Sequence, residues 1–168
     1  METRTLNAEE ISESGFAGYG RYVRTGQQEP AAKLTEFSFW NKLSVLNHTS
    51  TSIGLVEVHK QTEAVSTIFE QHVRTTETLI PADGAVILVL AKPMADDEKQ
   101  IDFDTVRAFR LQAGDAVVLD RAVWHFAPHP VDGSVKVWVI FEEDTPDNDL
   151  FMRHVDEEHG IRFVVAGA

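Results

Sequence analysis

The chain has 168 residues, a length that suits one domain with a sizeable core rather than two independently folded halves. Its 27 acidic and 15 basic residues give a net charge of −12, which repels nucleic acids and anionic lipid surfaces, so we exclude both as partners. Cysteine is absent, which excludes disulfides, zinc–thiolate sites and a thiol nucleophile. The N-terminal segment has no apolar core and the longest apolar run, 85–91, is too short to cross a bilayer, so we expect a soluble, cytoplasmic protein.

The first predicted element is a short helix near the N-terminus. Asn7 followed by Glu10 has the pattern of an N-cap with a capping box, and Ile11 and Phe16 supply apolar positions. We expect this helix to end at Gly18 or Gly20 and to be followed by a surface loop.

The rest of the chain predicts an all-β fold. Short segments rich in Val, Ile, Phe, Thr and Trp recur between Gly, Pro and Asp, as in an antiparallel sandwich or barrel. The predicted strands cover 34–40, 52–58, 66–72, 77–81, 85–90, 106–111, 116–119, 135–141 and 161–165. Two of them, 85–90 and 135–141, are apolar at nearly every position, which indicates strands covered on both faces, some of them by a partner chain.

A cluster of polar residues within 69–84 carries groups suited to chemistry. It places His72, Arg74 and Glu77 within six residues. On a strand, His72 and Arg74 point to the same side, so both could enter a barrel. Glu77 has the opposite parity unless a bulge or turn intervenes after Arg74.

A second cluster spans 114–130 and contains His125. Here a glycine turn leads into a short strand, and His125 follows a second turn, next to Trp124. A histidine beside an aromatic ring near a barrel mouth can act as a general base or as a metal ligand. A single histidine is more often structural, so the pairing of the two clusters is what indicates a site.

Together, the two clusters resemble the two motifs of the cupins. The resemblance implies a cupin-type double-stranded β-helix, that is, a jelly-roll barrel with a short N-terminal helix, formed by residues 1–168 as a single cupin domain. The spacing of the second motif matches throughout, with Gly114 and His125 in their expected positions. Asp120 takes the proline position, Ala122 the second glycine position and His129 the final asparagine position.

The first cupin motif departs from the pattern at its metal ligands. Arg74 replaces the second histidine, and Glu77 lies one residue too close to it. The resemblance therefore leaves at most three ligands for a divalent metal, His72, Glu77 and His125, and it leaves open whether a metal is bound.

Within the cupins, the sequence resembles the ureidoglycolate lyases, formerly called ureidoglycolate hydrolases. The agreement lies in the order and spacing of several short pieces, while Phe126 stands where a second histidine is common. The matching pieces are Phe16 to Gly20, Glu70 to Gly84, Val106 to Phe109 and Val123 to His125. This resemblance implies a carbon–nitrogen lyase that cleaves ureidoglycolate to glyoxylate and urea in allantoin and purine nitrogen catabolism.

Cleavage of ureidoglycolate requires a base, an acid and a cation that holds the substrate carboxylate. We assign the two proton transfers to Glu77 and His125, whose pKa values a shared apolar pocket could move toward neutrality. His72 is placed beside the substrate. The carboxylate anchor is Arg74, Arg107 or Lys136, with Arg74 preferred, and Trp124 and Trp138 are expected to form pocket wall or core.

Two other functions remain open at this stage. One is a different metal-dependent cupin enzyme, an isomerase or dioxygenase acting on a small hydroxy acid or sugar. The other is a non-catalytic cupin that binds a small acid. In each case we expect a small carboxylate ligand and a homodimer, because open sheet edges of small barrels are commonly covered by a partner.

Overall fold

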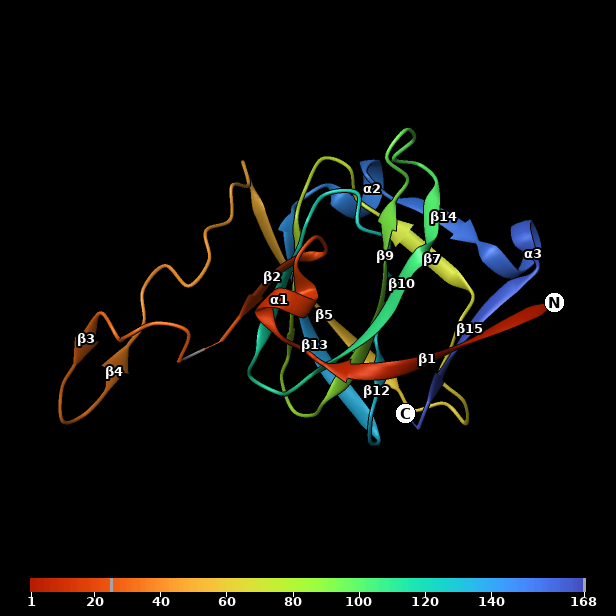
Figure 1. The fold of residues 1–168 in the computed structure, drawn as a ribbon. Helices are drawn as coiled ribbons and strands as arrows, with labels where there is room; N and C mark the ends of the chain where they lie inside the picture. The colour runs from red at the N-terminus through yellow and green to blue at the C-terminus, as the bar shows by residue number, and fades with distance from the viewer. Residues whose placement is uncertain (25, 168) are drawn as a thin grey trace.

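A computed structural model describes residues 1–24 and 26–167, and it is built mainly of strands (Figure 1). A six-stranded sheet contains β12 (His129–Pro130), β9 (Val86–Pro93), β10 (Ile101–Leu111), β1 (Glu2–Glu10), β15 (Ile161–Ala166) and β6 (Val65–Ser66), in that order. A five-stranded sheet contains β2 (Gly20–Val23), β11 (Ala116–Leu119), β8 (Glu77–Pro81), β13 (Ser134–Glu142) and β5 (Thr51–His59). The all-β prediction is confirmed.

Two smaller sheets and three short helices complete the described chain. β14 (Phe151–His154) pairs with β7 (Ile68–Gln71), and β3 (Ala32–Lys33) pairs with β4 (Ser38–Phe39). The helices are α1 (Glu13–Phe16), α2 (Thr145–Asn148) and α3 (Val155–His159). Within the described residues, the structure has no helix with the length and apolar character needed to span a membrane.

The prediction that the N-terminal helix begins at Asn7 is wrong. Residues 2–10 form β1, which pairs in parallel with β15 and then with β10, and the helix begins only after Ser12. The Ser12 Oγ accepts a hydrogen bond from the Gly15 backbone N–H at 3.1 Å, so Ser12 is the N-cap. Two neighbouring strands outweigh the weak local signal of a capping box, because each pairs with part of β1 and supplies hydrogen-bond partners for its backbone.

The two large sheets face each other across an apolar core. Leu88, Leu90 and Phe109 come from the six-stranded sheet, and Leu79, Leu119 and Val137 come from the five-stranded sheet. A second apolar cluster lies on the other face of the six-stranded sheet, where Phe69 and Val155 pack against Ile87 and Phe163. β9 is therefore buried on both faces, as its uninterrupted apolar sequence predicts.

In the single chain, β13 is covered on its inner face only. Val135, Val137 and Val139 are buried, but Trp138 between them is 44% exposed on the outer face of the sheet. The predicted strand 34–40 is wrong, since only Ser38–Phe39 of this segment is a strand, β4, and it pairs with β3 in a hairpin that stands away from the barrel (Figure 1).

Candidate active site

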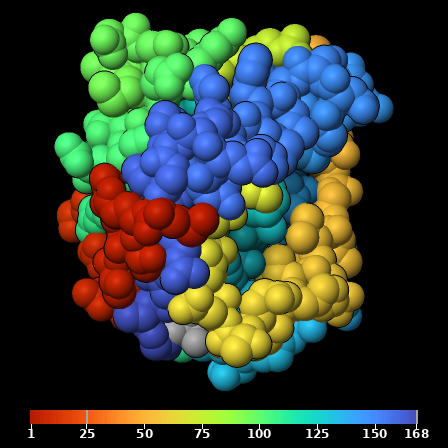
Figure 2. All heavy atoms as spheres, turned by 90° about the vertical axis from the view of Figure 1, so that its right-hand side faces the viewer, coloured from red at the N-terminus to blue at the C-terminus, as the bar shows by residue number. Residues whose placement is uncertain are grey.

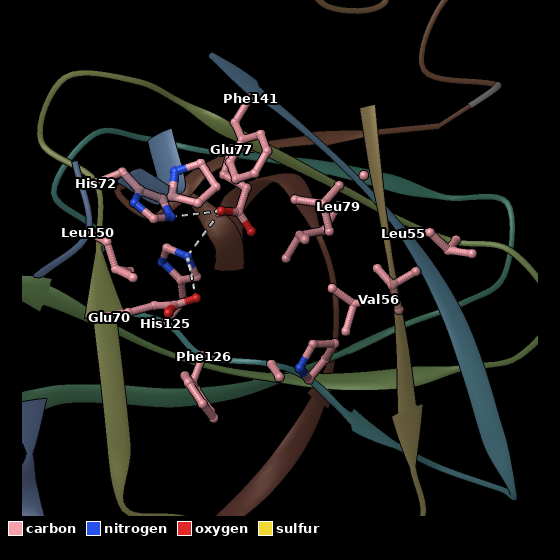
Figure 3. A pocket seen from close by; sticks show the side chains of 16 residues that line it. Leu55, Val56, Glu70, His72, Glu77, Leu79, His125, Phe126, Phe141 and Leu150 are labelled. Atoms are coloured by element: carbon pink, nitrogen blue, oxygen red, sulfur yellow. Dashed lines mark hydrogen bonds and ion pairs between the residues drawn. The ribbon is translucent and has the colours of Figure 1, made fainter. Parts of the chain in front are cut away.

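A cavity of about 270 Å³ lies against β8 and β13 of the five-stranded sheet. Its lining is largely apolar, with Val56, Leu79, Val137, Val139 and Phe141 from the sheets, Pro146 from α2, and Phe126 and Leu150 from connecting segments. Four ionisable side chains meet in this apolar surrounding, those of Glu70, His72, Glu77 and His125 (Figure 3). Figure 2 shows a hollow on one face of the molecule between gold residues of the β5 region and blue residues of the C-terminal part, with teal residues inside it.

The backbone itself brings the two histidine-bearing segments together. Glu70 and His125 form an isolated antiparallel bridge in which the Glu70 N–H donates to the His125 carbonyl at 2.6 Å and the His125 N–H donates to the Glu70 carbonyl at 2.8 Å. The Ala122 N–H donates to the His72 carbonyl at 2.7 Å. The distant clusters thus meet through hydrogen-bonded main chain, which fixes their relative position more firmly than side-chain contacts alone.

Glu77 is the centre of the polar cluster. Its Oε2 lies 3.0 Å from the His72 Nε2 and 3.4 Å from the His125 Nε2 (Figure 3). The His125 Nε2 also lies 3.9 Å from the Glu70 Oε1. Glu77, His72 and His125 are all buried, so little water screens these charges.

Each histidine ring is oriented by a hydrogen bond to a backbone carbonyl. The His72 Nδ1–H donates to the Asp149 carbonyl at 2.7 Å, and the His125 Nδ1–H donates to the Val123 carbonyl at 2.9 Å. Both rings therefore direct Nε2 into the cavity, which is how second partners commonly orient functional imidazoles.

Burial and charge act against each other on the pKa values of this pair. Burial alone would raise the pKa of Glu77, but the charge of His125 at 3.4 Å and the hydrogen bond and charge of His72 outweigh it and lower the pKa to about 2. Burial alone would lower the pKa of His125, but the nearby charges of Glu77 and Glu70 raise it to about 9. The expectation that both values move toward neutrality is thus wrong, because the two groups stabilise each other as a carboxylate and an imidazolium. Burial raises the pKa of Glu70.

Asp149 holds the His72 ring and the turn that follows it in position. Its buried carboxylate accepts hydrogen bonds from the backbone N–H groups of Val73 at 3.1 Å and Arg74 at 2.9 Å, while its carbonyl accepts from His72. Asp149→Ala should leave two N–H groups without partners, lowering the free energy of unfolding by about 3 kcal/mol and turnover by about tenfold. Chemical denaturation and turnover assays measure both effects, with the exposed Asp147→Ala as the control. Wild-type stability in Asp149→Ala would contradict this role.

The turn before His125 contains Ala122 in a left-handed conformation, with φ at 62°. This is the second glycine position of the cupin motif, and a β-branched side chain is poorly tolerated at such φ values. We expect Ala122→Val to lower the free energy of unfolding by about 2 kcal/mol and Ala122→Gly to leave it within about 1 kcal/mol of wild type. Denaturant titration of both variants checks this, and equal stability of the two would contradict it.

The structure places the predicted cationic anchors outside this cavity. His72 follows the end of β7, so the strand parity assumed for Arg74 does not apply, and Arg74 is 60% exposed beside Asn148 and Asp149. Arg107 donates to Glu9 through Nε at 2.9 Å and to the Gly15 carbonyl through Nη1 at 2.9 Å. Lys136 is exposed on the outer face of β13.

The two tryptophans also lie away from the cavity lining. Trp124 is fully buried in the second apolar cluster, because it faces the side of its segment opposite to His125, and its Nε1–H donates to the Gln100 carbonyl at 3.2 Å. Trp138 lies on the outer face of β13. The aromatic walls of the cavity are Phe126 and Phe141 instead.

Glu70 is the cavity residue that the sequence reasoning passed over. It lies two residues before His72, a spacing that places both side chains on the same side of an extended segment. This spacing could have identified Glu70 from the sequence. The apolar residues that line the cavity carry no comparable sequence signal.

A metal ion would find a fitting donor set in Glu70, His72 and His125. One ligand atom from each lies within 4.8 Å of the others, and the His125 Nε2 is buried without a hydrogen-bond partner in the described structure. Two imidazoles and a carboxylate suit several divalent metals. In this grouping Glu70 takes the place predicted for Glu77, which is hydrogen-bonded to His72.

The two facing sheets, with histidines converging in one cavity, define the chain as a cupin. The chain belongs to the ureidoglycolate lyase family, whose model matches residues 3–162. No curated protein matches the sequence.

Several solved structures are similar to this chain at low identity. An oxalate decarboxylase from Lactobacillus farciminis is 14% identical over 65% of this chain and 28% of its own, with a TM-score of 0.44. An oxalate oxidase is 17% identical over 63% of this chain and 46% of its own, with a TM-score of 0.45. RmlC from Streptococcus suis is 13% identical over 56% of this chain and 44% of its own, with a TM-score of 0.41. This chain thus spans less than half of the length of each of them.

Proposed function

We propose that this protein is a carbon–nitrogen lyase that cleaves ureidoglycolate to glyoxylate and urea. The observation that carries the proposal is the buried contact of Glu77 with His125 in the apolar cavity of a ureidoglycolate lyase family member. This contact supplies a proton acceptor and a proton donor side by side, as the reaction requires.

The reaction uses the two groups in opposite directions. The Glu77 carboxylate takes the hydroxyl proton of ureidoglycolate as the oxygen forms the carbonyl bond of glyoxylate. The bond from this carbon to the ureido nitrogen breaks, and the nitrogen takes a proton from the His125 Nε2 to leave as urea. Both described histidine contacts of Glu77 use Oε2, so Oε1 is the oxygen that faces the substrate in this scheme.

The same contact restores the enzyme after each turnover. The reaction leaves Glu77 protonated and His125 neutral. Rotation of the Glu77 carboxyl group brings its protonated oxygen to the position of Oε2, 3.4 Å from the His125 Nε2, and the proton passes to the imidazole, which regenerates the starting ion pair.

The substrate carboxylate needs a positive partner, and the cavity lining in the described structure contains no Lys or Arg. The positive charge of the His125 imidazolium, which Glu77 and Glu70 stabilise, attracts the substrate carboxylate, while its Nε2–H is kept for the leaving nitrogen. A divalent metal bound by Glu70, His72 and His125 would instead supply positive charge for oxygen atoms of the substrate. The two arrangements exclude one another, since the His125 Nε2 cannot both bind a metal and donate a proton.

The direct test is incubation of the purified protein with ureidoglycolate and measurement of both products. The proposal predicts that glyoxylate and urea appear in equal amounts. Formation of glyoxylate with ammonia and carbon dioxide in place of urea, or no glyoxylate at all, would reject it.

The metal-ligand grouping favours a second candidate, a metal-dependent cupin enzyme acting on another small hydroxy acid or sugar. Elemental analysis separates the two candidates. Stoichiometric metal without turnover of ureidoglycolate supports the second.

The pH dependence of the lyase reaction follows from the two pKa values. His125 must be protonated, and its raised pKa keeps it so up to about pH 9, while the lowered pKa of Glu77 keeps it ionised down to about pH 2. We therefore expect kcat/KM of chelator-treated protein to be flat across the neutral range and to fall above about pH 9. A fall centred between pH 6 and 7, the range of an ordinary histidine, would contradict the ion pair.

The physiological setting is part of the same proposal. Family membership supports a role in allantoin and purine nitrogen catabolism in the cytoplasm, with residues 1–168 acting as a single cupin domain.

A further inference from the structure

The cavity has two chemically different sides. Figure 3 shows its four ionisable side chains gathered on one side, with Leu79 and Val56 on the other. The strand register continues this second side, because Leu79 lies beside Val139 of β13 and Val56 lies beside Val137 of the same strand. All four of these side chains line the cavity, and we call them the apolar wall. The apolar wall thus extends from β8, two residues after Glu77, to β5 at the edge of the sheet.

The apolar wall offers no polar side chain to a bound molecule. In the part of the chain that the structure describes, no side chain with a hydroxyl, amide, ammonium or guanidinium group lines the cavity, so its polar side chains are the four ionisable ones. The backbone of β13 is paired with β8 on one side and with β5 on the other. A polar group placed against this wall would lose its hydrogen bonds to water without replacing them, and this loss opposes binding.

Ureidoglycolate itself would leave the apolar wall without a matching group. In the proposed reaction its carboxylate, hydroxyl group and leaving nitrogen all lie on the ionisable side of the cavity. Its remaining end is an amino group, which needs hydrogen-bond partners that the wall lacks. The cavity of about 270 Å³ has room for about nine water molecules at about 30 Å³ each, whereas ureidoglycolate, with about as many non-hydrogen atoms joined by covalent bonds, takes less space. Space therefore remains along the apolar wall.

We propose that the preferred substrates of this site are α-hydroxyglycines whose nitrogen carries an apolar acyl group, R–CO–NH–CH(OH)–COO⁻, with R against the apolar wall. The inference rests on the proposed lyase reaction and changes only R, which is an amino group in ureidoglycolate. Glu77 takes the hydroxyl proton, the bond from the carbinol carbon to nitrogen breaks, and the nitrogen takes a proton from the His125 Nε2. The products are glyoxylate and the primary amide R–CO–NH₂, so atoms and charges balance without a further reactant.

Phe126 and Val56 carry the apolar contact to the place where the cavity meets solvent. Both line the cavity, yet Phe126 is 36% exposed and Val56 is 40% exposed. A bound R group would remove apolar surface of both side chains from water together with its own, which favours binding. One methylene in a hydrophobic pocket changes kcat/KM by about 10- to 200-fold, so we expect an R group the size of a phenyl ring to be preferred over an amino group by at least about tenfold.

The first test compares turnover of ureidoglycolate with that of α-hydroxyhippurate, in which R is a phenyl ring, by release of glyoxylate from the full-length protein. We expect kcat/KM to be at least about tenfold higher for α-hydroxyhippurate. Equal or faster turnover of ureidoglycolate would overturn the inference and leave the proposed lyase intact. Turnover of α-hydroxyhippurate alone would support the inference and reject ureidoglycolate as the substrate, and turnover of neither would overturn both.

The second test measures binding without catalysis. Hippurate and N-carbamoylglycine are the same two molecules without the hydroxyl group, so the lyase reaction cannot cleave them. By isothermal titration calorimetry we expect hippurate to bind at least about tenfold more tightly than N-carbamoylglycine.

Phe126→His places a polar ring beside R and should reduce this ratio of affinities by about fivefold. Phe39→His, the same change on the hairpin that stands away from the barrel, is the control and should keep the wild-type ratio. Circular dichroism verifies that both variants are folded. Equal affinities of the two analogues for wild type, or a ratio that Phe126→His leaves unchanged, would overturn the inference.

Discussion

Glu77→Gln is expected to lower kcat/KM for ureidoglycolate cleavage by about two to four orders of magnitude, the usual contribution of a positioned general base. Glutamine keeps the shape of the side chain and can still contact His72, but it cannot take the hydroxyl proton. It also removes the negative charge that raises the pKa of His125, so the alkaline limb of the remaining activity should move to lower pH. Steady-state glyoxylate release across a pH series measures both effects.

The matched control for Glu77→Gln is Glu70→Gln, the other carboxylate of the cavity. Its Oε1 lies 3.9 Å from the His125 Nε2, against 3.4 Å for Glu77, and it contacts no other histidine within ion-pair distance in the described structure. If Glu77 is the base, Glu70→Gln should cost less than about tenfold. A reversed order, with Glu70→Gln inactive and Glu77→Gln active, would show that Glu70 acts as a metal ligand and that the proposed mechanism is wrong.

His125→Ala is expected to abolish the acid step, with a loss of about two to four orders of magnitude in kcat/KM. The buried Glu77 keeps its hydrogen bond from His72 at 3.0 Å, so we expect the Tm to stay within a few degrees of wild type. Activity assays and thermal unfolding followed by circular dichroism measure the two quantities.

His129→Ala is the matched control for this variant. His129 lies on β12 in the same segment of the chain, where its Nε2 is 2.8 Å from the Ser66 Oγ, and it does not line the cavity. This variant should keep wild-type kcat. Wild-type turnover by His125→Ala would show that the active site does not lie in this cavity.

Local patterns were sufficient to predict the strands that lie in the middle of the sheets. β8 and β11 begin and end where the sequence predicts, because their apolar runs are bounded by turn residues on both sides. β1 was not predictable in this way. Its partners β10 and β15 are about a hundred or more residues away, and nothing within residues 2–10 reveals that pairing.

The candidate site was predictable where it follows a motif. The paired clusters brought His72, Glu77 and His125 together, and the structure places all three in one cavity. The prediction for Arg74 depended on a strand continuing past His72, but the chain leaves β7 at Gln71 and the Asp149 carboxylate holds the following turn. The opposed pKa values could not be foreseen, because they depend on distances between side chains that the sequence does not contain.

The central claim is that the Glu77–His125 ion pair performs the cleavage with no metal on the His125 Nε2. The most direct measurement is the turnover of ureidoglycolate by protein stripped with a chelator, with the residual metal content determined on the same sample. We predict wild-type turnover at a metal content far below one ion per chain. Turnover that disappears on stripping and returns with a divalent cation would contradict the claim.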